Sequence, residues 1–576
     1  MLFIFISVII LTCLLAGWGA LCVRFIRIET DNPWLHPFLG MLAAGTAFSV
    51  VSMFLPLNGT ALIVFILAGL TGLFFWTRVL KAWCSGYSHG VCLLFLVLTF
   101  ACTLLLAARC GHTEWISAAY DTDLYHANIV RWLNEYGTPK GLANLHTRLG
   151  NNSIWLTLAA LFDNGYWDNR TAWIMPTLSA LCITAYLLYN VLFSTAGKVR
   201  LFCGCMLFFT VGINIMWSFP NLFFDFPALF INVIVFVECL ARAEDGWKIT
   251  PRQASLILCL AALAFAIKPI AGVSVLFAMG ITLYGLKKSR SLSITHLCVA
   301  FLPAAVVGIV WMARNSLLSG YPLFPLPFFS LPMDWTTPKE MVVATYQAVI
   351  GWARSPGPGY RESLNNWNWI VPWVERQFVS RIFWLSAGLP LLAAIPLWIK
   401  ILCQKQKSNA VFFAIWTVLC LCYWFFSAPD LRFGVVFFQI FFALGLAFAL
   451  HQAPWLAIWK ARYASFLQSR RLCVSASAVV LLIAISASAR QFHFHSSKSV
   501  GQLYAKRSAF TISGNGIPSR ELLSRPLDTS VSPPILLFFP VDGDQCGNSP
   551  LPCTPYDNPR LRLRLPGNLG GGFYIE

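Results

Sequence analysis

The chain has 576 residues, of which 58% are hydrophobic and only 11% are charged, and its formal net charge is +18. A soluble protein of this length could not keep so little charge on its surface, so the composition indicates a membrane protein. The sequence has no basic domain interleaved with aromatic residues, which argues against nucleic-acid binding. We therefore attribute the positive charge to membrane topology and to contact with anionic membrane lipids.

Apolar runs of about 17 to 25 residues recur along the whole sequence, and each can cross a hydrocarbon core about 30 Å thick. They predict an all-α polytopic membrane protein. Two short pairs of runs, around "FPNLFFDFPALF" and "AIKPIAG", could instead be re-entrant hairpins, so 12 to 14 transmembrane helices are expected. The expected spans are 2–23, 36–56, 60–77, 91–108, 171–193, 201–219, 227–241, 254–268, 271–286, 295–313, 382–399, 410–427, 433–450 and 472–489.

Lysine and arginine residues collect on alternate loops between these spans, and such loops are typically cytoplasmic. The sequence therefore predicts a protein of the bacterial cytoplasmic (inner) membrane, with both termini extracytoplasmic and the first span retained as an uncleaved anchor. The basic residues on the expected cytoplasmic side are Arg24, Arg27, Arg78, Lys81, Lys198, Arg200, Arg242, Lys248, Arg252, Lys287, Lys288, Arg290, Lys405, Lys407, Lys460, Arg462, Arg470 and Arg471.

The expected organisation is one membrane domain with external loops and a small extracytoplasmic C-terminal α/β cap. In the cap, the run "PPILLFFPV" predicts a strand that is buried against the membrane domain. The expected parts are an N-terminal transmembrane module (1–108), an external loop with interfacial helices and an acidic motif (109–170), transmembrane helices (171–313), a second external loop (314–381), further transmembrane helices (382–489) and the extracytoplasmic tail (490–576).

The stretch "AAYDTDLYHANIVRWLNEYG" is a polar interruption in the first external loop. Its spacing predicts an amphipathic helix at the membrane interface, and "NSIWLTLAALF" predicts a second helix that is too short to cross. The expected apolar face of the first helix has Tyr125, Ile129, Trp132, Leu133 and Tyr136, and the polar face has His126, Arg131, Asn134 and Glu135.

Two aspartates, Asp121 and Asp123, stand at the amino end of that first helix. Helix capping accounts for one of them, because an aspartate at an N-cap contributes about 1 kcal/mol. The second aspartate, with His126 beside it and His146 and Arg148 further along, favours a functional site. Both interpretations stay open.

Further ionisable residues stand at the expected outer ends of spans, where an ionisable group indicates a functional site. These are Lys268 in "AIKPIAG", Arg314 in "ARNSLL", and Asp430 and Arg432 in "APDLRFG". The simpler alternatives are a snorkelling arginine for Arg314 and a local ion pair for Asp430 with Arg432.

All these positions are expected on one face of the membrane, where the bundle could bring them into one cavity. A carboxylate there could take a proton from an acceptor hydroxyl, while arginine and lysine neutralise a departing phosphate. The residues that could converge are Asp121, Asp123, His126, Lys268, Arg314 and Arg432.

Most of the 18 cysteines lie inside apolar spans, where cysteine packs as a small hydrophobic residue. Cys546 and Cys553 differ, because they flank a turn in "GDQCGNSPLPCTPYDNP" on the side that we expect to be oxidising. A disulfide between them is predicted. The alternative is a metal pair, although no further cysteine or histidine stands nearby to complete four ligands.

Asp121, Tyr125 and Gly137 in "DTDLYHANIVRWLNEYG" resemble the acidic motif in the first external loop of the GT-C superfamily of multi-pass glycosyltransferases. Four expected spans precede this loop, whereas in that superfamily it usually follows the first span. The resemblance implies transfer of a sugar from a polyprenyl-phosphate donor on the outer face, with Asp121 or Asp123 as the base. External His, Arg and Lys residues would then hold the lipid phosphate.

The chain is also similar to an uncharacterised family of bacterial polytopic membrane proteins, through "GLANLHTRLG", "RNSLLSGYPLFP", "APDLRFG" and "GDQCGNSPLPCTPY". That similarity implies no established reaction. Two other functions stay open, which are a transporter or flippase of lipid-linked sugars and a non-catalytic envelope assembly protein. No cofactor is implied with certainty, and a divalent metal stays open.

Overall fold

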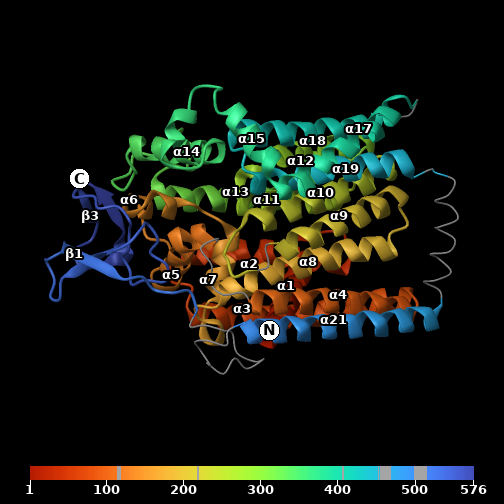
Figure 1. The fold of residues 1–576 in the computed structure, drawn as a ribbon, viewed down its shortest axis with the longest axis horizontal. Coiled ribbons are helices and arrows are strands. Elements are labelled where there is room, and N and C mark those ends of the chain that lie inside the picture. Colours follow the sequence, from red (N-terminus) through yellow and green to blue (C-terminus); the bar gives the residue numbers. More distant parts are fainter. Residues whose placement is uncertain are drawn as a thin grey trace.

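The computed structural model describes residues 1–30, 32–112, 119–216, 219–404, 408–451, 453, 469–498 and 516–576. Long helices form a bundle, and a small β-sheet cap lies at one end of it (Figure 1). Within the described residues, eleven helices are long and apolar enough to cross a membrane. The expectation of a polytopic all-α membrane protein is therefore confirmed.

Every expected span coincides with a helix. Of the three that are not among the eleven, α11 is shorter, α21 is apolar only over Arg471–Ser486, and α9 covers 201–216 of the expected span 201–219. The helices are α1 (Leu2–Ile26), α2 (His36–Ser52), α3 (Gly59–Gly86), α4 (His89–His112), α8 (Thr171–Phe193), α9 (Gly197–Met216), α10 (Asp225–Glu244), α11 (Pro251–Ile267), α12 (Gly272–Lys288), α13 (Ile294–Ser319), α16 (Arg381–Phe383) continuing into α17 (Leu389–Leu402), α18 (Ser408–Ser427), α19 (Leu431–Leu450) and α21 (Arg470–Lys498).

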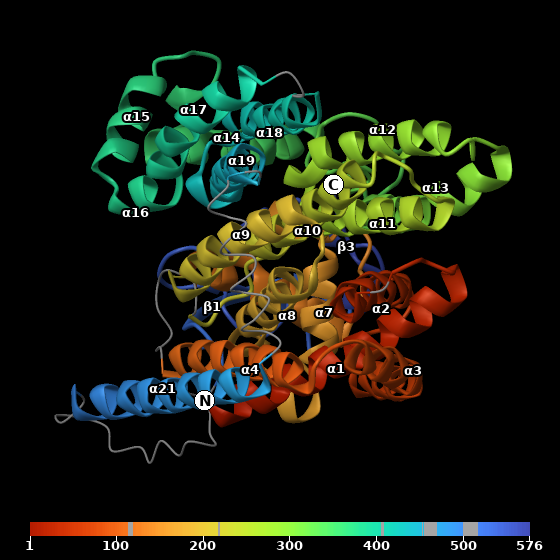
Figure 2. The ribbon, with the colours of Figure 1, turned by 90° about the vertical axis from the view of Figure 1, so that its right-hand side faces the viewer.

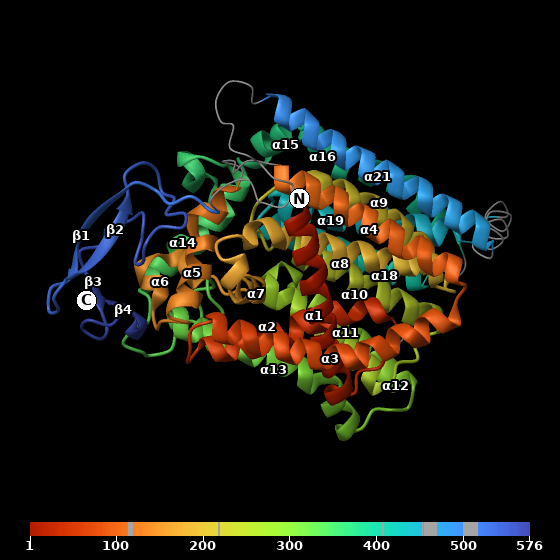
Figure 3. The ribbon, with the colours of Figure 1, turned by 90° about the horizontal axis from the view of Figure 1, so that it is seen from below.

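Close helix contacts hold the N-terminal part of the bundle together. A Cβ atom added to Gly72 of α3 would lie 2.0 Å from the carbonyl oxygen of Gly17 in α1, so only glycine fits there. Small residues at such contacts let helix backbones approach closely within a membrane. Helix α21 returns to this part of the bundle and lies alongside α4 (Figures 2 and 3).

Within the described chain, several of the basic loops contact one another at the end of the bundle away from the cap. There, Lys198 forms an ion pair with Glu244 at 3.2 Å, and the Thr250 hydroxyl donates to Glu29 at 2.8 Å. Helix α10 runs from Asp225, near the cap, to Glu244, and its 20 residues span about 30 Å. The bundle therefore separates the basic loops from the cap and the longer polar segments.

The longer segments form short helices and the cap. The short helices are α5 (Ala127–Glu135), α6 (Leu142–Leu145), α7 (Ile154–Phe162), α14 (Lys339–Arg354) and α15 (Ile370–Val379). The cap has two antiparallel pairs, β1 (Leu522–Asp528) with β2 (Ile535–Pro540) and β3 (Leu561–Leu563) with β4 (Phe573–Ile575). The sequence did not predict α14 and α15.

Three expectations for these segments are wrong in detail. The described part of the cap, 516–576, has strands and one 3-10 turn but no α-helix, so it is not α/β. The expected strand exists as β2, but only Leu537 in it is buried. Helix α21 continues to Lys498, past residue 490 where the tail was expected to begin.

The expected interfacial helices are enclosed by protein. Trp132 of α5 is fully buried and packs edge to face on Phe573 of the cap, with ring centroids 5.7 Å apart. All nine residues of α7 are buried as well. His126, which was expected on a polar face, is only 2% exposed. The polar interruption therefore packs between the bundle and the cap, although Tyr120, Asp121 and Glu135 still reach the surface.

Candidate functional site

The segment that contains the two aspartates adopts an unusual helical turn. Residues Thr122–His126 form a π-helical turn directly before α5, and Asp121 precedes it without making a side-chain capping hydrogen bond. The Thr122 hydroxyl accepts a hydrogen bond from the backbone N–H of Leu222 at 3.0 Å, which ties the turn to the start of α10. Such turns often occur at functional sites. Because Asp121 makes no capping hydrogen bond, helix capping does not account for its carboxylate.

Asp121 forms an ion pair with Arg432, at the start of α19. The distance from Arg432 Nη1 to Asp121 Oδ2 is 2.8 Å, and the side chains of Arg432 and Asp121 are 26% and 22% exposed. Asp430 caps α19 by accepting from the backbone N–H of Arg432 at 3.0 Å, and its carboxylate lies 3.4 Å from Arg432 Nε. Burial, the largest single effect, raises the pKa of Asp121, but the charge and hydrogen bond of Arg432 together with the charges of neighbouring groups outweigh it and hold that pKa below its usual value. Asp121 is therefore an ionised, partly accessible carboxylate at neutral pH.

A second ion pair lies beside the first. Lys268 follows α11 in an extended conformation, as expected for a residue that precedes a proline, and it pairs with Asp225 at the start of α10. The Lys268 ammonium lies 3.4 Å from the centroid of the Phe433 ring, and the Arg432 guanidinium lies 4.8 Å from the same centroid. Phe433 thus contacts both cations.

His126 lies among the charges of both ion pairs. Its ring packs against Phe224 and Phe223, at centroid distances of 5.0 and 6.0 Å. Neither ring nitrogen has a hydrogen-bond partner within the described chain. Burial lowers the pKa of His126 to about 4, although Asp121 and Asp225 act in the opposite direction. The imidazole is therefore neutral at physiological pH and has both nitrogens uncommitted.

His146 and Arg148 face the cap side of Asp121. The His146 ring lies 5.4 Å from the ring of Tyr556 in the cap, and burial lowers the pKa of His146 to about 3. Arg148 is half-buried, and its charge contributes, after that of Arg432, to keeping the pKa of Asp121 low. Arg148 is therefore a second cation near the Asp121 carboxylate.

Asp123 has a different environment from Asp121. Its side chain is 2% exposed and pairs with Arg520 of the cap at 2.6 Å, and its backbone carbonyl accepts from the N–H of Gly547 at 2.8 Å. Sequence reasoning missed Arg520. One hint of this pairing was present in the sequence: a buried aspartate needs a cationic partner, and the tail contains several arginines that could supply it.

The expected convergence of six residues therefore occurs in part. Asp121, His126, Lys268 and Arg432 lie together, with Asp225, Asp430 and Arg148 around them. Asp123 faces the cap. Arg314 is buried elsewhere, in a network of hydroxyl and amide groups.

No set of three or more His, Cys, Asp or Glu side chains in the described chain is placed to hold a metal ion. Asp121 and Asp225 each bind a cationic side chain instead. Cys546 and Cys553 are joined in the disulfide that the sequence predicts, which removes them as a metal pair.

The fold and the site together define a multi-pass helical membrane protein with a cluster of buried and partly exposed ion pairs at one end of its bundle. Residues 1–439 match the model of the family described as "Domain of unknown function (DUF8201)", so the chain belongs to this family. The match includes both ion pairs and ends before the cap. No curated protein and no solved structure matches the chain.

Proposed function

We propose that this chain is a membrane glycosyltransferase. It would transfer a sugar from a polyprenyl-phosphate donor to a glycan, lipid or protein acceptor of the cell envelope. The observation that carries the proposal is the partly exposed Asp121–Arg432 ion pair, which sets a carboxylate and a phosphate-binding group side by side. The resemblance of Asp121, Tyr125 and Gly137 to the GT-C motif supports the same class of reaction.

In the proposed reaction, Asp121 takes the proton of an acceptor hydroxyl. The acceptor oxygen then bonds to the anomeric carbon as the bond from that carbon to the phosphate oxygen breaks, and Arg432 stabilises the departing lipid phosphate. Without donor, Arg432 keeps the pKa of Asp121 low, so Asp121 is a weak base. A donor phosphate that engages Arg432 would offset this charge and strengthen the base, so donor binding would prepare the site for the acceptor.

We also propose that the cap and the ion-pair cluster face the outside of a bacterial inner membrane. The basic loops at the opposite end support this orientation, because cytoplasmic loops are enriched in lysine and arginine. A polyprenyl-phosphate sugar would then reach the cluster from the outer leaflet.

The Asp121→Asn variant tests the proposal, because asparagine keeps the size of the side chain but cannot act as a base. Transfer of label from a radiolabelled lipid-linked sugar pool, measured in native membranes, should fall on the order of 10² to 10⁴ at equal expression. The Asp334→Asn variant is a matched control, since Asp334 forms an exposed ion pair with Arg564 at 2.7 Å, outside the cluster. It should transfer as the parent does.

Full transfer by Asp121→Asn would contradict the proposed role of Asp121 as the base.

The Arg432→Lys variant tests donor binding separately from proton transfer, because lysine keeps the charge but loses the two-pronged contact to phosphate. It should weaken binding of undecaprenyl phosphate, used as the probe, while the protein folds normally.

Transport of lipid-linked sugars is a second candidate, favoured by one observation. Glu238 lies within α10 and accepts a hydrogen bond from the Tyr186 hydroxyl of α8 at 2.7 Å, and an acidic group inside a transmembrane helix often marks a transport path. If this candidate is right, Glu238→Gln should stop movement of the lipid across the membrane and Asp121→Asn should not.

A further inference from the structure

Arg314 is a buried cation in a network that contains no acid. Its Nη1 donates to Asn152 Oδ1 and to Thr157 Oγ1, both at 2.8 Å, and its Nε donates to Thr138 Oγ1 at 3.3 Å. The network continues to two serines of α2, because Ser49 bonds Thr157 and Ser52 bonds Thr138. All these groups are neutral, so the network carries one positive charge.

The charge of Arg314 has no counter-ion among the described residues. Its side chain is 2% exposed, and no aspartate or glutamate of the described chain forms an ion pair with it. None of its three hydrogen bonds uses Nη2, which leaves two N–H donors uncommitted. Burying a charge without an acidic partner is costly even where neutral groups accept its hydrogen bonds, so an anion bound here would stabilise the folded protein.

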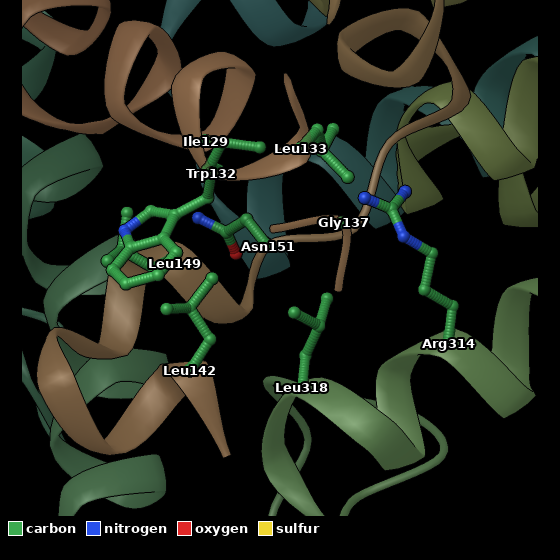
Figure 4. Close-up of a pocket in the computed structure, with 9 residues that line it drawn as sticks. All are labelled: Ile129, Trp132, Leu133, Gly137, Leu142, Leu149, Asn151, Arg314 and Leu318. Atoms are coloured by element: carbon green, nitrogen blue, oxygen red, sulfur yellow. The ribbon is translucent and has the colours of Figure 1, made fainter. Parts of the chain in front are cut away.

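A small pocket adjoins this guanidinium group. Figure 4 shows Arg314 rising from α13 at the edge of the pocket beside Leu133, with Asn151 across from it. The other lining residues are aliphatic or aromatic, apart from a glycine, and the space admits about one water-sized particle. An anion in this pocket must therefore be monatomic and must tolerate a largely apolar wall, and since a halide is somewhat larger than water, the aliphatic side chains must shift slightly to seat it. Phosphate, sulfate and lipid headgroups are too large.

We propose that Arg314 and the pocket beside it form a binding site for a halide ion, with chloride as the physiological ligand. Arg314 Nη2 would donate to the ion, and the Asn151 amide could supply a further donor. The ion would neutralise the charged network between α2, α7 and α13 and so stabilise this side of the bundle. This site is separate from the Asp121 cluster and does not depend on the proposed transferase activity.

Halide-dependent stability of the purified full-length protein in detergent tests this site. Sodium chloride or sodium bromide would replace sodium gluconate at constant ionic strength, and Tm would be followed by tryptophan fluorescence. We expect a saturable rise of roughly 1 to 3 °C with either halide, because a ligand that binds only the folded state raises Tm. Gluconate is too large to enter.

Two variants identify the site. Arg314→Gln should lose the halide response because it has no charge to neutralise, and Leu318→Phe should lose it because the larger side chain fills the pocket. Arg354→Gln is the matched control, since Arg354 likewise donates to neutral oxygens, the carbonyl oxygens of Ser363 and Phe426, but lies outside the pocket. It should keep the full response.

Bromide provides a direct readout that needs no variant. Crystals grown with bromide should give an anomalous peak beside Arg314 Nη2. Equal Tm in halide and gluconate would mean that only water occupies the pocket and would overturn the proposal. A full halide response in Arg314→Gln or Leu318→Phe, or an anomalous peak only elsewhere, would overturn it as well.

Discussion

At the scale of single residues, His126 should make the folded protein sensitive to acid. Its pKa is about 4 in the folded protein, against 6.5 for the ordinary side chain, so the unfolded chain binds more protons between these values. The contribution of neutral His126 to stability is complete above pH 6.5 and is lost as pH falls toward 4. Between pH 7 and pH 5 the loss should be about 2 kcal/mol in the free energy of unfolding.

The His126→Phe variant should lose this part of the pH dependence, because phenylalanine keeps the ring contacts with Phe223 and Phe224 without a proton to bind. Urea unfolding at pH 7 and pH 5, followed by tryptophan fluorescence, measures the difference. His296, which is exposed, supplies the control, and His296→Gln should remain as acid-sensitive as the parent. An unchanged pH dependence in His126→Phe would mean that His126 is not buried in its neutral form.

The residue scale also shows what the sequence could not reveal about the two aspartates. Their position before a helix was predictable from spacing, and their proximity to charged span ends followed from topology. Which of them is accessible was not predictable, because the π-helical turn aims them differently and the partner of Asp123 lies 397 residues away. Local pattern carries no information on such a distant contact.

At the scale of elements, the loop closed by Cys546 and Cys553 should hold the π-helical turn in place. Gly547 donates to Asp123, and Arg131 of α5 donates to the carbonyl oxygens of Asn548 and Ser549 at 3.1 and 2.8 Å. A disulfide that closes so short a loop contributes roughly 2 to 3 kcal/mol. Replacing both cysteines by serine should therefore loosen the turn and speed hydrogen exchange in 119–126.

Mass spectrometry of exchanged peptides measures this effect, with peptides of α12 and α13 as internal references. Cys298→Ser is the control, since Cys298 is an exposed free cysteine far along the chain from the cap. If the amide hydrogens of 119–126 exchange at the parent rate in the variant with both cysteines replaced by serine, the loop does not hold the turn.

The helices also show what the spacing of apolar residues can and cannot predict. The hydrocarbon thickness fixes the length of a span, so every long helix could be located from the sequence. The apolar face of α5 was predicted, but the packing of Trp132 against the cap was not, because the cap comes from a distant segment. The amphipathic pattern of α14, with Met341, Val342, Thr345 and Val349, was present in the sequence and was overlooked.

At the scale of the whole molecule, the proposed orientation predicts which ends of the bundle are accessible in cells. A Leu565→Cys variant places a thiol on the exposed cap, and Lys288→Cys places one at the opposite end. An impermeant maleimide should label the first in intact cells and the second only after the inner membrane is opened. The exposed residues Cys298, Cys403 and Cys422 would first be replaced by serine to lower the background.

The reverse pattern would contradict the orientation and would also remove the outer-leaflet donor. Labelling at both positions in intact cells would instead indicate leaky membranes. Comparing each variant before and after permeabilisation, with a cytoplasmic reference protein in the same sample, separates these outcomes.

The contact between Arg520 and Asp123 also has a consequence for biosynthesis. The ribosome completes the bundle first, because Arg520 is made 397 positions after Asp123 and the contact cannot form before then. In the orientation that we propose, the cap must then cross the membrane to reach Asp123, after α21 has been made. A nascent chain thus carries its acidic turn uncovered through almost all of translation, and the enclosed environment of Asp123 arises only when synthesis is nearly over.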